Sequence, residues 1–318
     1  MRILLESCHP CHSSRRIERA LAQNAPQNAP PNVEIVPAGT VGYQFEVTEA
    51  ERRSDLVLLH VGGRWTQVMN RVRRLNDAGI PYAVLQLVIR GTQHPDTADW
   101  LDLWRGAAFV WSYYDLESMV RDDGHDPDGV TFYRSPLGVD PAFAPSAPSG
   151  VRHYLAFAEG DNPERDSLTQ IHRAVRRENG RMIHLGPFRL EGPARANRVE
   201  WRTNVTDEEL VALYNQAQWV TGLRTVEGFE MCAAEGLMCG ARPILFDRKH
   251  HRDWFGDLAE YIPEDTTDLM VQWLRELFAE GPRPVTAEEY AEARERFAWE
   301  PIAKGFWDAV QTWEGATT

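Results

Sequence analysis

Short apolar runs separated by amphipathic stretches organise the first half of the chain. Asp55–His60 and Pro81–Val88 are continuous apolar runs, which are typical of strands buried on both faces of a parallel sheet. Between them, Trp65–Ala78 repeats its apolar residues with a helical period and ends before Gly79. A strand, a helix and a second strand in this order predict one βαβ unit of a parallel sheet.

The same alternation extends from the N-terminus to residue 134. We expect strands at Arg2–Glu6, Val33–Pro37, Ala107–Ser112 and Val130–Arg134, and helices at Ser13–Asn24, Asp99–Gly106 and Leu116–Arg121. The stretch Pro141–Gly150, which is rich in proline and small residues, then predicts a linker.

The pattern restarts after this linker. We expect strands at Arg152–Ala158, Arg181–Leu185, Val199–Trp201, Trp219–Leu223 and Pro243–Phe246, and helices at Ser167–Glu178, Asp207–Ala217 and Met231–Cys239. Thr206 and Glu209 form the capping box of one of these helices. Helices are expected to fill most of the remaining sequence. The predicted fold class is therefore α/β, with two facing Rossmann-like domains of parallel sheets at residues 1–147 and 151–299.

The segment Val220–Asp247 carries the most informative chemistry. A strand ends near Gly222, a loop carries Glu227 and Gly228, and a helix then begins near residue 230 and contains Glu235. Gly228 lets the backbone approach a ligand closely. The amides at the helix start form an anion site that the helix dipole strengthens.

Two carboxylates beside an anion site suit a ligand that combines hydroxyl groups with phosphate. Glu227 and Glu235 are spaced by a little over two helical turns, so both face the same opening. A nucleotide sugar is such a ligand. The alternative is that these glutamates only cap and solvate the helix, and the spacing alone does not decide between the two.

The charge balance narrows the choice of partners. The formal net charge of −13 disfavours an overall electrostatic grip on nucleic acid, although a local basic groove remains compatible with it. Lys249 and Lys304 are the only lysines, so a phosphate-binding cation is expected to be an arginine. No apolar stretch is long enough to span a membrane, and the N-terminus has no signal-peptide pattern, so we expect a cytoplasmic protein.

A cluster of potential metal ligands lies near the N-terminus. Cys8, His9, Cys11 and His12 match the C-x-x-C-H pattern of attached haem, but haem attachment needs export. A zinc site would need a second ligand pair, and none lies nearby in the sequence. We therefore interpret this segment as a polar loop after the first strand, and predict no metal and no cofactor.

Several motifs, taken in order along the chain, resemble one family. Glu227 and Glu235 match an E-x7-E motif, and the residues that follow, GLMCGARPILFD, resemble its E-A-M-A-x-G-x-P-V-V-A run. Arg296–Ala303 resembles R-F-S-W-E-x-I-A, Ser135–Asp140 resembles I-P-N-G-V-D, and Asp55–His60 is similar to D-V-V-H-x-H. The family is that of the retaining glycosyltransferases of GT-B fold, glycosyltransferase family 4, and the compact length is similar to its viral members.

The resemblance implies a role for each matched residue. Glu227 would bond the hydroxyls of the donor sugar and Glu235 the ribose of the nucleotide. Backbone amides around Gly228, Phe229 and Glu230 would contact sugar and phosphate. Arg165, in the loop after the first strand of the second domain, would clamp the departing diphosphate. The final helix, residues 300–318, would cross back onto the first domain.

The reaction that the resemblance implies is transfer of a hexosyl unit with retention of configuration. The donor would be a nucleotide-diphosphate sugar, most commonly a uridine diphosphate (UDP) sugar, and no metal would be required. Electrostatic stabilisation of the leaving diphosphate would then come from arginine and from the helix start.

The sequence also departs from the family pattern. Glu230 stands where the family has glycine, and Arg224 stands in place of a serine, where it could compensate Glu230 or touch the phosphates. The family's active-site histidine is expected near the end of the Pro81–Val88 strand, where this sequence has Leu87, with His94 a few residues on. We place His60, His94 and Arg64 on the acceptor side, the alternative for His60 being a satisfied histidine at a strand end.

The acceptor is read by the first domain, which matches the family least. Its arginines could contact phosphates of an acceptor such as DNA carrying hydroxymethylated bases or an anionic lipid, or could simply form a solvated face. These arginines are Arg15, Arg16, Arg19, Arg52, Arg53, Arg64, Arg71, Arg73 and Arg74. Two other functions are kept as alternatives: an inactive nucleotide-sugar binding module, and another GT-B enzyme such as a sugar-nucleotide epimerase.

Overall fold

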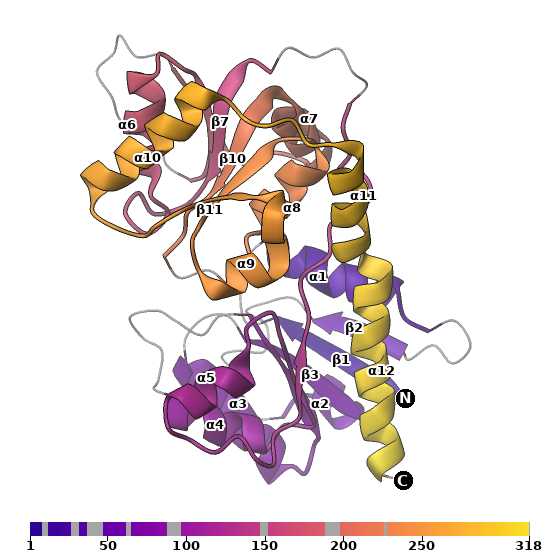
Figure 1. Ribbon diagram of the computed structural model, residues 1–318. Helices are drawn as coiled ribbons and strands as arrows, with labels where there is room; N and C mark the ends of the chain where they lie inside the picture. Colours follow the sequence, from indigo (N-terminus) through magenta and orange to yellow (C-terminus); the bar gives the residue numbers. More distant parts are fainter. Residues whose placement is uncertain are drawn as a thin grey trace. The chain divides into compact units, whose positions relative to one another are not determined.

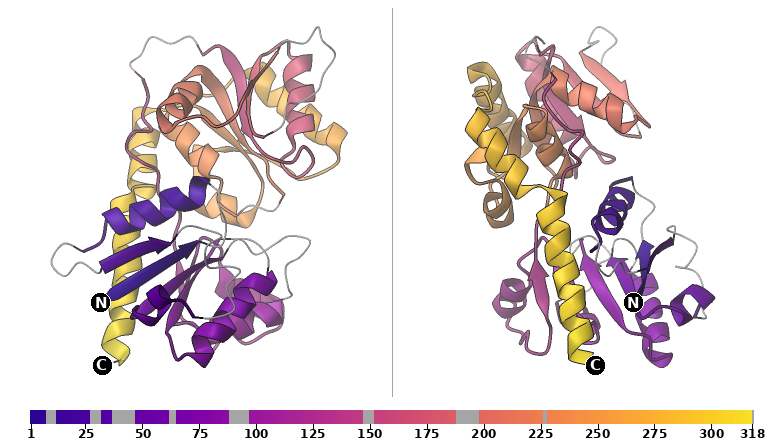
Figure 2. Two further views of the ribbon diagram at one scale, coloured as in Figure 1. Left: turned by 180° about the vertical axis from the view of Figure 1, so that it is seen from behind. Right: turned by 90° about the vertical axis from the view of Figure 1, so that its right-hand side faces the viewer.

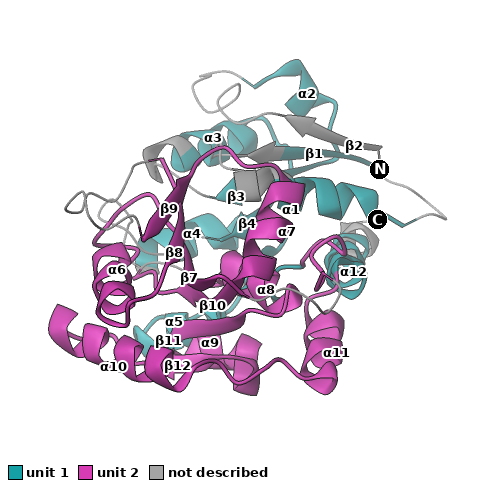
Figure 3. Cartoon of the chain, turned by 90° about the horizontal axis from the view of Figure 1, so that it is seen from above, with its two compact units in different colours: residues 1–138, 299–318 teal, residues 139–298 magenta. Residues whose placement is uncertain are grey.

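The chain forms two compact units in a computed structural model. Unit 1 comprises Met1–Gly138 and Trp299–Thr318, and unit 2 comprises Val139–Ala298 (Figure 3). The structure describes all residues except 8–11, 27–31, 37–46, 62–64, 88–96, 147–151, 188–197, 226–227 and 318. The expected linker, residues 141–150, falls within unit 2.

Unit 1 is a six-stranded parallel sheet with helices on its faces (Figure 1). The strand order is β2-β1-β3-β4-β5-β6. The strands are β1 (Arg2–Ser7), β2 (Asn32–Val36), β3 (Leu56–Val61), β4 (Tyr82–Gln86), β5 (Val110–Ser112) and β6 (Phe132–Arg134). The helices are α1 (His12–Gln23), α2 (Glu49–Arg52), α3 (Trp65–Asp77), α4 (Thr97–Arg105), α5 (Leu116–Asp122) and α12 (Trp299–Thr317).

Unit 2 repeats this plan with a second six-stranded parallel sheet. Its strand order is β12-β11-β10-β7-β8-β9. The strands are β7 (Tyr154–Glu159), β8 (Met182–Leu185), β9 (Val199–Arg202), β10 (Ala217–Gly222), β11 (Arg242–Phe246) and β12 (Glu260–Ile262). The helices are α6 (Leu168–Arg177), α7 (Asp207–Gln216), α8 (Met231–Met238), α9 (Lys249–Phe255), α10 (Thr267–Glu280) and α11 (Ala287–Arg296), with a short 3-10 turn at Gly256–Leu258.

The C-terminal helix α12 packs within unit 1, although it follows unit 2 in the sequence (Figure 2). The indole nitrogen of Trp307 donates a hydrogen bond to the carbonyl of Leu21 on α1, at 3.0 Å. The ring of Phe306 lies edge-on to those of Phe109 and Trp111. Gly138 leaves no room for a side chain, because a Cβ there would lie 2.3 Å from the Trp299 ring.

In unit 2, α8 packs closely against β10 and β11. A Cβ on Gly236 of α8 would lie 2.6 Å from the Val220 side chain, so glycine is needed for this approach. All residues of α8 after Met231 are buried, including Glu235. The helix that carries the second motif glutamate is therefore fixed to the centre of the sheet.

The predicted parallel α/β architecture is confirmed, and two short elements were missed. Helix α2 was not expected, although Thr48 and Glu51 form a capping box at its start. The edge strand β12 lay in a region expected to be helical. Both elements are only three or four residues long, so neither shows a period that a sequence pattern can reveal.

His251 of α9 provides a test of this packing through pH. The ring is fully buried, and its Nδ1 donates to the carbonyl of Phe246 at 2.9 Å. Burial, together with the neighbouring His250, lowers the pKa of His251 to about 3. His251 therefore binds a proton near pH 6.5 in the unfolded chain but only near pH 3 in the folded chain. Its neutral form stabilises the fold above pH 6.5, and this contribution is lost as the pH falls towards 3.

We expect the free energy of unfolding of the wild type to fall as the pH drops from 7 to 5, with His251 contributing up to about 1.4 kcal/mol per pH unit below its ordinary pKa. His251→Asn keeps a donor for Phe246 but does not titrate, and should flatten the slope. Urea unfolding at several pH values measures how the free energy of unfolding changes with pH. Burial also lowers the pKa of His184 and of His172, and these two histidines contribute to the slope that remains. An unchanged slope in the variant would refute the assignment.

Candidate functional site

The site in unit 2 lies at the carboxyl ends of β7 and β10. The chain runs from β7 outwards to β8 and β9, and then returns to place β10 on the other side of β7. This reversal is a topological switch point, where open α/β sheets bind their ligands beyond the strand ends. The residues that follow β7 and β10 are therefore the first candidates for ligand contact.

The loop between β7 and α6 is held by its own side chains. Buried Asp166 accepts hydrogen bonds from the amides of Asp161 and Asn162 at 2.8 and 2.9 Å. The side chain of Asn162 accepts from the amides of Glu164 and Arg165 at 3.0 and 2.9 Å. Four amides of the loop thus already have partners, so an anion here must be met by side chains.

A close backbone approach fixes this loop from the other side. A Cβ on Gly186, just after β8, would lie 2.0 Å from the carbonyl oxygen of Gly160. A Cβ on Gly160 would lie 2.6 Å from the carboxylate of Asp166. Both positions need glycine, and the loop after β7 is rigid as a result.

Arg165, the predicted clamp, lies on this loop and is 41% exposed. Its guanidinium pairs with Asp161 and contacts the carboxylate of Asp166 at 3.2 Å. The pair with Asp161 is a surface pair, because the Asp161 side chain is 63% exposed. Such pairs contribute about 0–1 kcal/mol. Arg165 can therefore exchange Asp161 for a phosphate at little cost.

The loop after β10 is anchored at four points. Ser167 donates from its hydroxyl to the carbonyl of Leu223 at 2.8 Å, and the amide of Thr225 donates to the carbonyl of Arg165 at 2.9 Å. The guanidinium of Arg248, just after β11, donates to the carbonyls of Arg224 and Thr225, both at 3.1 Å. The chain that leads into the motif is thus held in place up to residue 225.

Arg224 lies between two carboxylates. Its guanidinium donates to the carbonyl of Glu159 at 3.3 Å and lies 3.8 Å from the carboxylate of the same residue. Its Nε lies 3.9 Å from the carboxylate of Glu230. This geometry fits the predicted compensation of Glu230, with one face of Arg224 still 21% exposed towards solvent.

Glu230 is a fully buried carboxylate at the start of α8. Its side chain packs over the end of β10, where a Cβ on Gly222 would lie 2.7 Å from it. Its Oε2 also lies 3.8 Å from the Cys232 thiol, and burial together with Glu230 raises the pKa of that thiol well above its usual value. Glu230 is thus enclosed, and its side chain has no exposed surface to present to a ligand.

The other residues of the motif differ in which of their atoms could contact a ligand. Gly228 is buried, and the ring of Phe229 packs against Phe255 and Phe297. Phe229 therefore contributes a core side chain, and only its backbone is left for a ligand. Glu227, the predicted sugar-binding carboxylate, lies outside the described residues.

Glu235 lies inside α8 and is 3% exposed. The hydroxyl of Tyr214 on α7 donates to its Oε2 at 3.2 Å. The Tyr214 ring packs in turn on Phe157 of β7, at 4.5 Å between centroids. The carboxylate is thereby held on a rigid support in the middle of unit 2, and a ligand can reach only a small edge of it.

Arg248 gives a direct test of the anchored loop. Hydrogen bonds from a charged donor contribute about 1.5–3 kcal/mol. Arg248→Gln should therefore loosen residues 223–225 and weaken binding of the nucleotide sugar that the sequence predicts as ligand about 5- to 10-fold, as a binding titration would show. Arg252→Gln is the matched control four residues later, on α9, because Arg252 bonds to Asp247 at 2.9 Å instead. Equal effects of the two changes would contradict the assignment.

The residues of unit 1 that we expect on the acceptor side are only partly described. His60 is buried near the end of β3, with its Nδ1 3.3 Å from the carboxylate of Glu18 on α1. His94 and Arg64 lie outside the described residues, as do Cys8, His9 and Cys11. No group of three or more histidine, cysteine or carboxylate side chains arranged for a metal is found in the described part of the chain.

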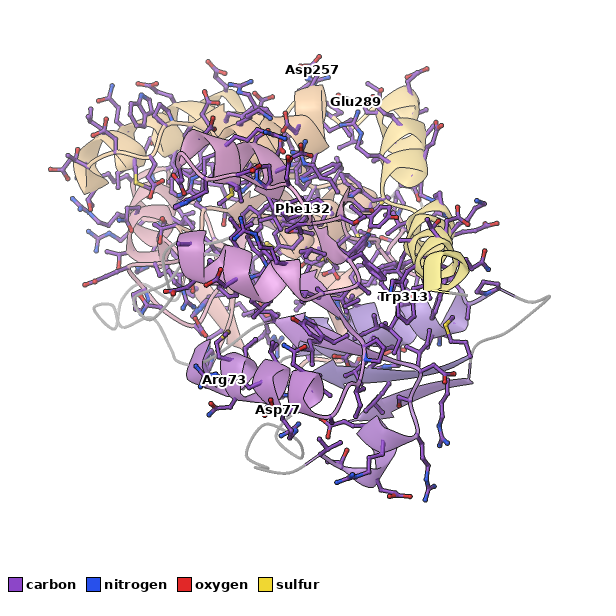
Figure 4. The ribbon with its side chains drawn as sticks, turned by 90° about the horizontal axis from the view of Figure 1, so that it is seen from below. Arg73, Asp77, Phe132, Asp257, Glu289 and Trp313 are labelled. Carbon is purple, nitrogen blue, oxygen red and sulfur yellow. The ribbon has the colours of Figure 1, made fainter. Side chains whose placement is uncertain are left out.

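The expectation that the arginines of unit 1 form an exposed basic surface is wrong for two residues of α3. Arg71 and Arg74 of α3 are buried, at 1% and 8% exposure, and Arg74 pairs with the buried Glu51. Burial, helped by the like charge of Arg74, lowers the pKa of Arg71 to about 9. Arg73 and Asp77 of the same helix are exposed (Figure 4). Two arginines of the expected solvated or phosphate-binding face are therefore internal, because α3 turns them towards the core.

The fold is that of the GT-B glycosyltransferases, and solved structures of this class match the whole chain. HepE from Anabaena, in complex with UDP-glucose, matches with a TM-score of 0.71 and 13% identity over 98% of this chain and 100% of HepE. Sucrose-phosphate synthase from Thermosynechococcus elongatus matches with a TM-score of 0.69 and 13% identity, covering 99% of this chain and 100% of its own.

AviGT4, a glycosyltransferase of avilamycin A biosynthesis, matches with a TM-score of 0.61 and 16% identity over 99% of this chain and 98% of AviGT4. No protein-family model matches the sequence, and no curated protein matches it. Among the described residues, no helix is both long and apolar enough to cross a membrane.

Three contacts of the site were missed from the sequence. They are Arg248 on the loop after β10, Tyr214 on Glu235, and Glu18 on His60. Arg248 had a usable signal, because it is the second residue after the predicted strand Pro243–Phe246 and so lies near the carboxyl edge of the sheet, where ligands bind. Tyr214 and Glu18 had none, because each is one polar residue of an ordinary amphipathic helix.

Proposed function

We propose that this chain is a retaining glycosyltransferase that moves a hexosyl unit from a nucleotide-diphosphate sugar, with UDP-sugars favoured, to a hydroxyl acceptor. The observation that carries the proposal is the position of the E-x7-E segment. In a GT-B fold, it follows the strand beside the switch point of unit 2, and it leads directly into α8. The full-length match to HepE, which was solved with UDP-glucose, supports the choice of donor.

The chain's own residues would bind the donor as follows. The ribose hydroxyls take the exposed edge of Glu235, whose other side Tyr214 holds. The diphosphate lies at the start of α8, where the helix dipole favours negative charge. Glu227 takes the sugar hydroxyls, and the backbone around Gly228 allows the sugar to come close.

Bond breaking would separate the sugar from the diphosphate on one face of the ring. The acceptor oxygen forms the new bond to the anomeric carbon on the face that the diphosphate leaves, and the acceptor proton passes to the leaving phosphate oxygen. Negative charge grows on the diphosphate as it leaves, so cations fixed nearby stabilise the transition state more than the ground state. Arg165 supplies that charge once it releases Asp161, and Arg224 supports it. No metal ion is required in this proposal.

This mechanism requires that the carboxylates around the site leave one arginine able to turn to the diphosphate. Glu159, Asp161 and Asp166 surround the two arginines, and Glu230 lies buried beside them. Asp166 is neutralised in part by the amides of its own loop, and Glu230 by the nearby Arg224. The exposed Arg165 is then the cation with most freedom to turn to the ligand.

The decisive experiment is a thermal-shift screen of the purified chain with UDP-glucose, UDP-galactose, UDP-N-acetylglucosamine and GDP-mannose. A true donor at about 100 times its Kd stabilises the fold by about 2.7 kcal/mol. Release of UDP should follow with the same donor. No shift with any of the four would contradict the proposal.

Two other outcomes identify the alternatives. Stabilisation by a donor without any release of nucleotide would indicate a binding module. Conversion of the donor into its epimer, detected by chromatography of the donor-only reaction, would indicate a sugar-nucleotide epimerase.

A further inference from the structure

The strand β9 (Val199–Arg202) forms one edge of the sheet of unit 2 (Figure 3). Its inner side pairs in parallel with β8, and no other strand in the described part of the chain pairs with its outer side. An edge strand exposes a row of backbone donors and acceptors with which another chain can pair. The outer side of β9 therefore offers backbone groups to a partner.

The hydrogen bonds to β8 show which residues of β9 face outwards. The amide of Met182 donates to the carbonyl of Arg198 at 2.7 Å. The amide of Gly186, just after β8, donates to the carbonyl of Arg202 at 3.0 Å. The even-numbered residues of β9 thus direct their backbone groups towards β8. Backbone groups alternate in direction along a strand, so the N–H and C=O of Trp201 point away from the sheet.

The side chain of Trp201 is exposed and held in place. At 38% exposure it is, with Leu269, one of two large apolar side chains exposed among the described residues. Its indole nitrogen donates to the carbonyl of Gly186 at 3.0 Å, so the ring has a fixed orientation. Tryptophan is enriched among the residues that contribute most to protein interfaces, and a ring that is already fixed loses little freedom on binding.

Two opposite charges flank Trp201 on β9. Glu200 and Arg202 lie on the face of the sheet opposite to Trp201, because side chains alternate along a strand. The Nε of Arg202 donates to Glu200 at 2.9 Å, and the two side chains are 52% and 24% exposed. Glu200 also accepts a hydrogen bond from the hydroxyl of Tyr154. Exposed ion pairs are weak, so both charges remain able to pair with a neighbouring chain.

These charges select one register for pairing with a second copy. A two-fold axis makes the two β9 strands antiparallel, and with Trp201 opposite its own copy, Glu200 of each chain faces Arg202 of the other. A shift of one strand by two residues, in either direction, keeps outward-facing residues paired. It then places Glu200 opposite Glu200, or Arg202 opposite Arg202, and like charges directly opposite destabilise the pairing. Charges usually keep edge strands apart, whereas this arrangement is self-complementary.

We propose that unit 2 binds a second copy of this chain through β9, with the two strands antiparallel and Trp201 opposite its own copy. The two sheets join into one across the pair of strands. The backbone of each Trp201 donates to and accepts from the other, and a Glu200–Arg202 pair forms on either side. The contact is short, so the dimer is weak and reversible. This inference does not depend on the proposed function.

Sedimentation equilibrium of the full chain tests the dimer. The average mass of the wild type should rise from one chain towards two between about 1 and 500 µM, as a small interface predicts. Glu200→Arg and Arg202→Glu each place like charges opposite one another twice, so each should weaken self-association at least about 10-fold. An equimolar mixture of these two variants restores opposite charges in both pairs, and should form a heterodimer with the affinity of the wild type.

Two further variants keep the test decisive if either charge reversal unfolds the chain, which thermal unfolding would show. Trp201→Pro removes the outward N–H at a position where an edge strand tolerates proline, and should abolish self-association. Arg275→Glu reverses an exposed charge on α10 and should associate like the wild type.

Three results would overturn the dimer. They are a wild type that stays monomeric throughout the concentration range, self-association that Trp201→Pro leaves unchanged, and folded charge variants whose mixture does not associate. The last two results would also exclude β9 as the contact if the wild type dimerised through another surface. Binding and turnover of UDP-glucose are measured separately, so failure of the proposed function would leave this test unaffected.

Discussion

Replacement of Arg242 by methionine should lower the free energy of unfolding of unit 2 by about 3–5 kcal/mol. Arg242 is buried at the start of β11 and bonds to both carboxylate oxygens of Glu289 on α11, at 3.1 and 2.8 Å. The same guanidinium donates to the carbonyls of Leu258, Arg283 and Pro284. Methionine would leave a carboxylate and three carbonyls without these donors.

Urea unfolding of Arg242→Met and of a matched surface variant measures this effect. Arg275→Met is the control, because Arg275 pairs with Glu178 at 2.7 Å while it is 44% exposed. Exposed pairs contribute about 0–1 kcal/mol, so the control should unfold close to the wild type. Similar losses in the two variants would show that Arg242 is not the main link between β11 and α11.

The same pair has a signature in acid. The hydrogen bonds from Arg242 lower the pKa of Glu289 to about 2. The pair therefore stabilises the fold above the ordinary pKa of glutamate, and this contribution is lost as the pH falls towards 2. In Arg242→Met, the part of the acid dependence that belongs to Glu289 should become smaller, and the remainder is due to the Thr286 amide and Arg283, which also lower the pKa of Glu289.

Replacement of Glu227 by glutamine should lower kcat/KM for UDP-glucose about 100- to 1000-fold while leaving UDP binding unchanged. The carboxylate is proposed to contact only the sugar, and these contacts strengthen as charge develops in the transition state. UDP lacks the sugar, so its thermal shift should equal that of the wild type. Steady-state release of UDP and a thermal-shift titration give the two values.

Glu235→Gln provides the contrasting pattern. Its carboxylate is proposed to contact the ribose, which UDP and UDP-glucose share, so both ligands should bind more weakly. Glu208→Gln, an exposed position on α7, is the control for loss of a negative charge. If Glu227→Gln weakened UDP as much as UDP-glucose, the division of roles between the two glutamates would be wrong.

The sequence was most informative where a single segment determines its own structure. The apolar run Asp55–His60 forms most of the buried strand β3 (Leu56–Val61), and the capping box at Thr206 and Glu209 begins α7. The helix that contains Glu235 begins at Met231, as predicted. In each case neighbouring residues carry the signal, so a pattern of period two, period 3.6 or a cap is sufficient.

The details of the site depend on residues that meet only in the folded chain. Arg248 reaches carbonyls about twenty residues earlier, and Tyr214 reaches a carboxylate on another helix. The position of Glu230 was expected beside a phosphate, but its side chain is enclosed between Gly222, Arg224 and Cys232. Periodicity places a residue on a face of its helix, and it does not reveal which partner covers that face.

The loop after β7 is held by hydrogen bonds between its own amides and side chains, and this affects how donor preference could change. Its peptide groups already serve Asp166 and Asn162, so under the proposed function this loop can contribute to diphosphate binding only through its side chains, while the start of α8 supplies the backbone amides. If the proposed function holds, substitutions at Arg165 or Arg224 should change how the diphosphate is bound without changing the backbone of this loop. Laboratory selection for new donors should then begin at these two arginines.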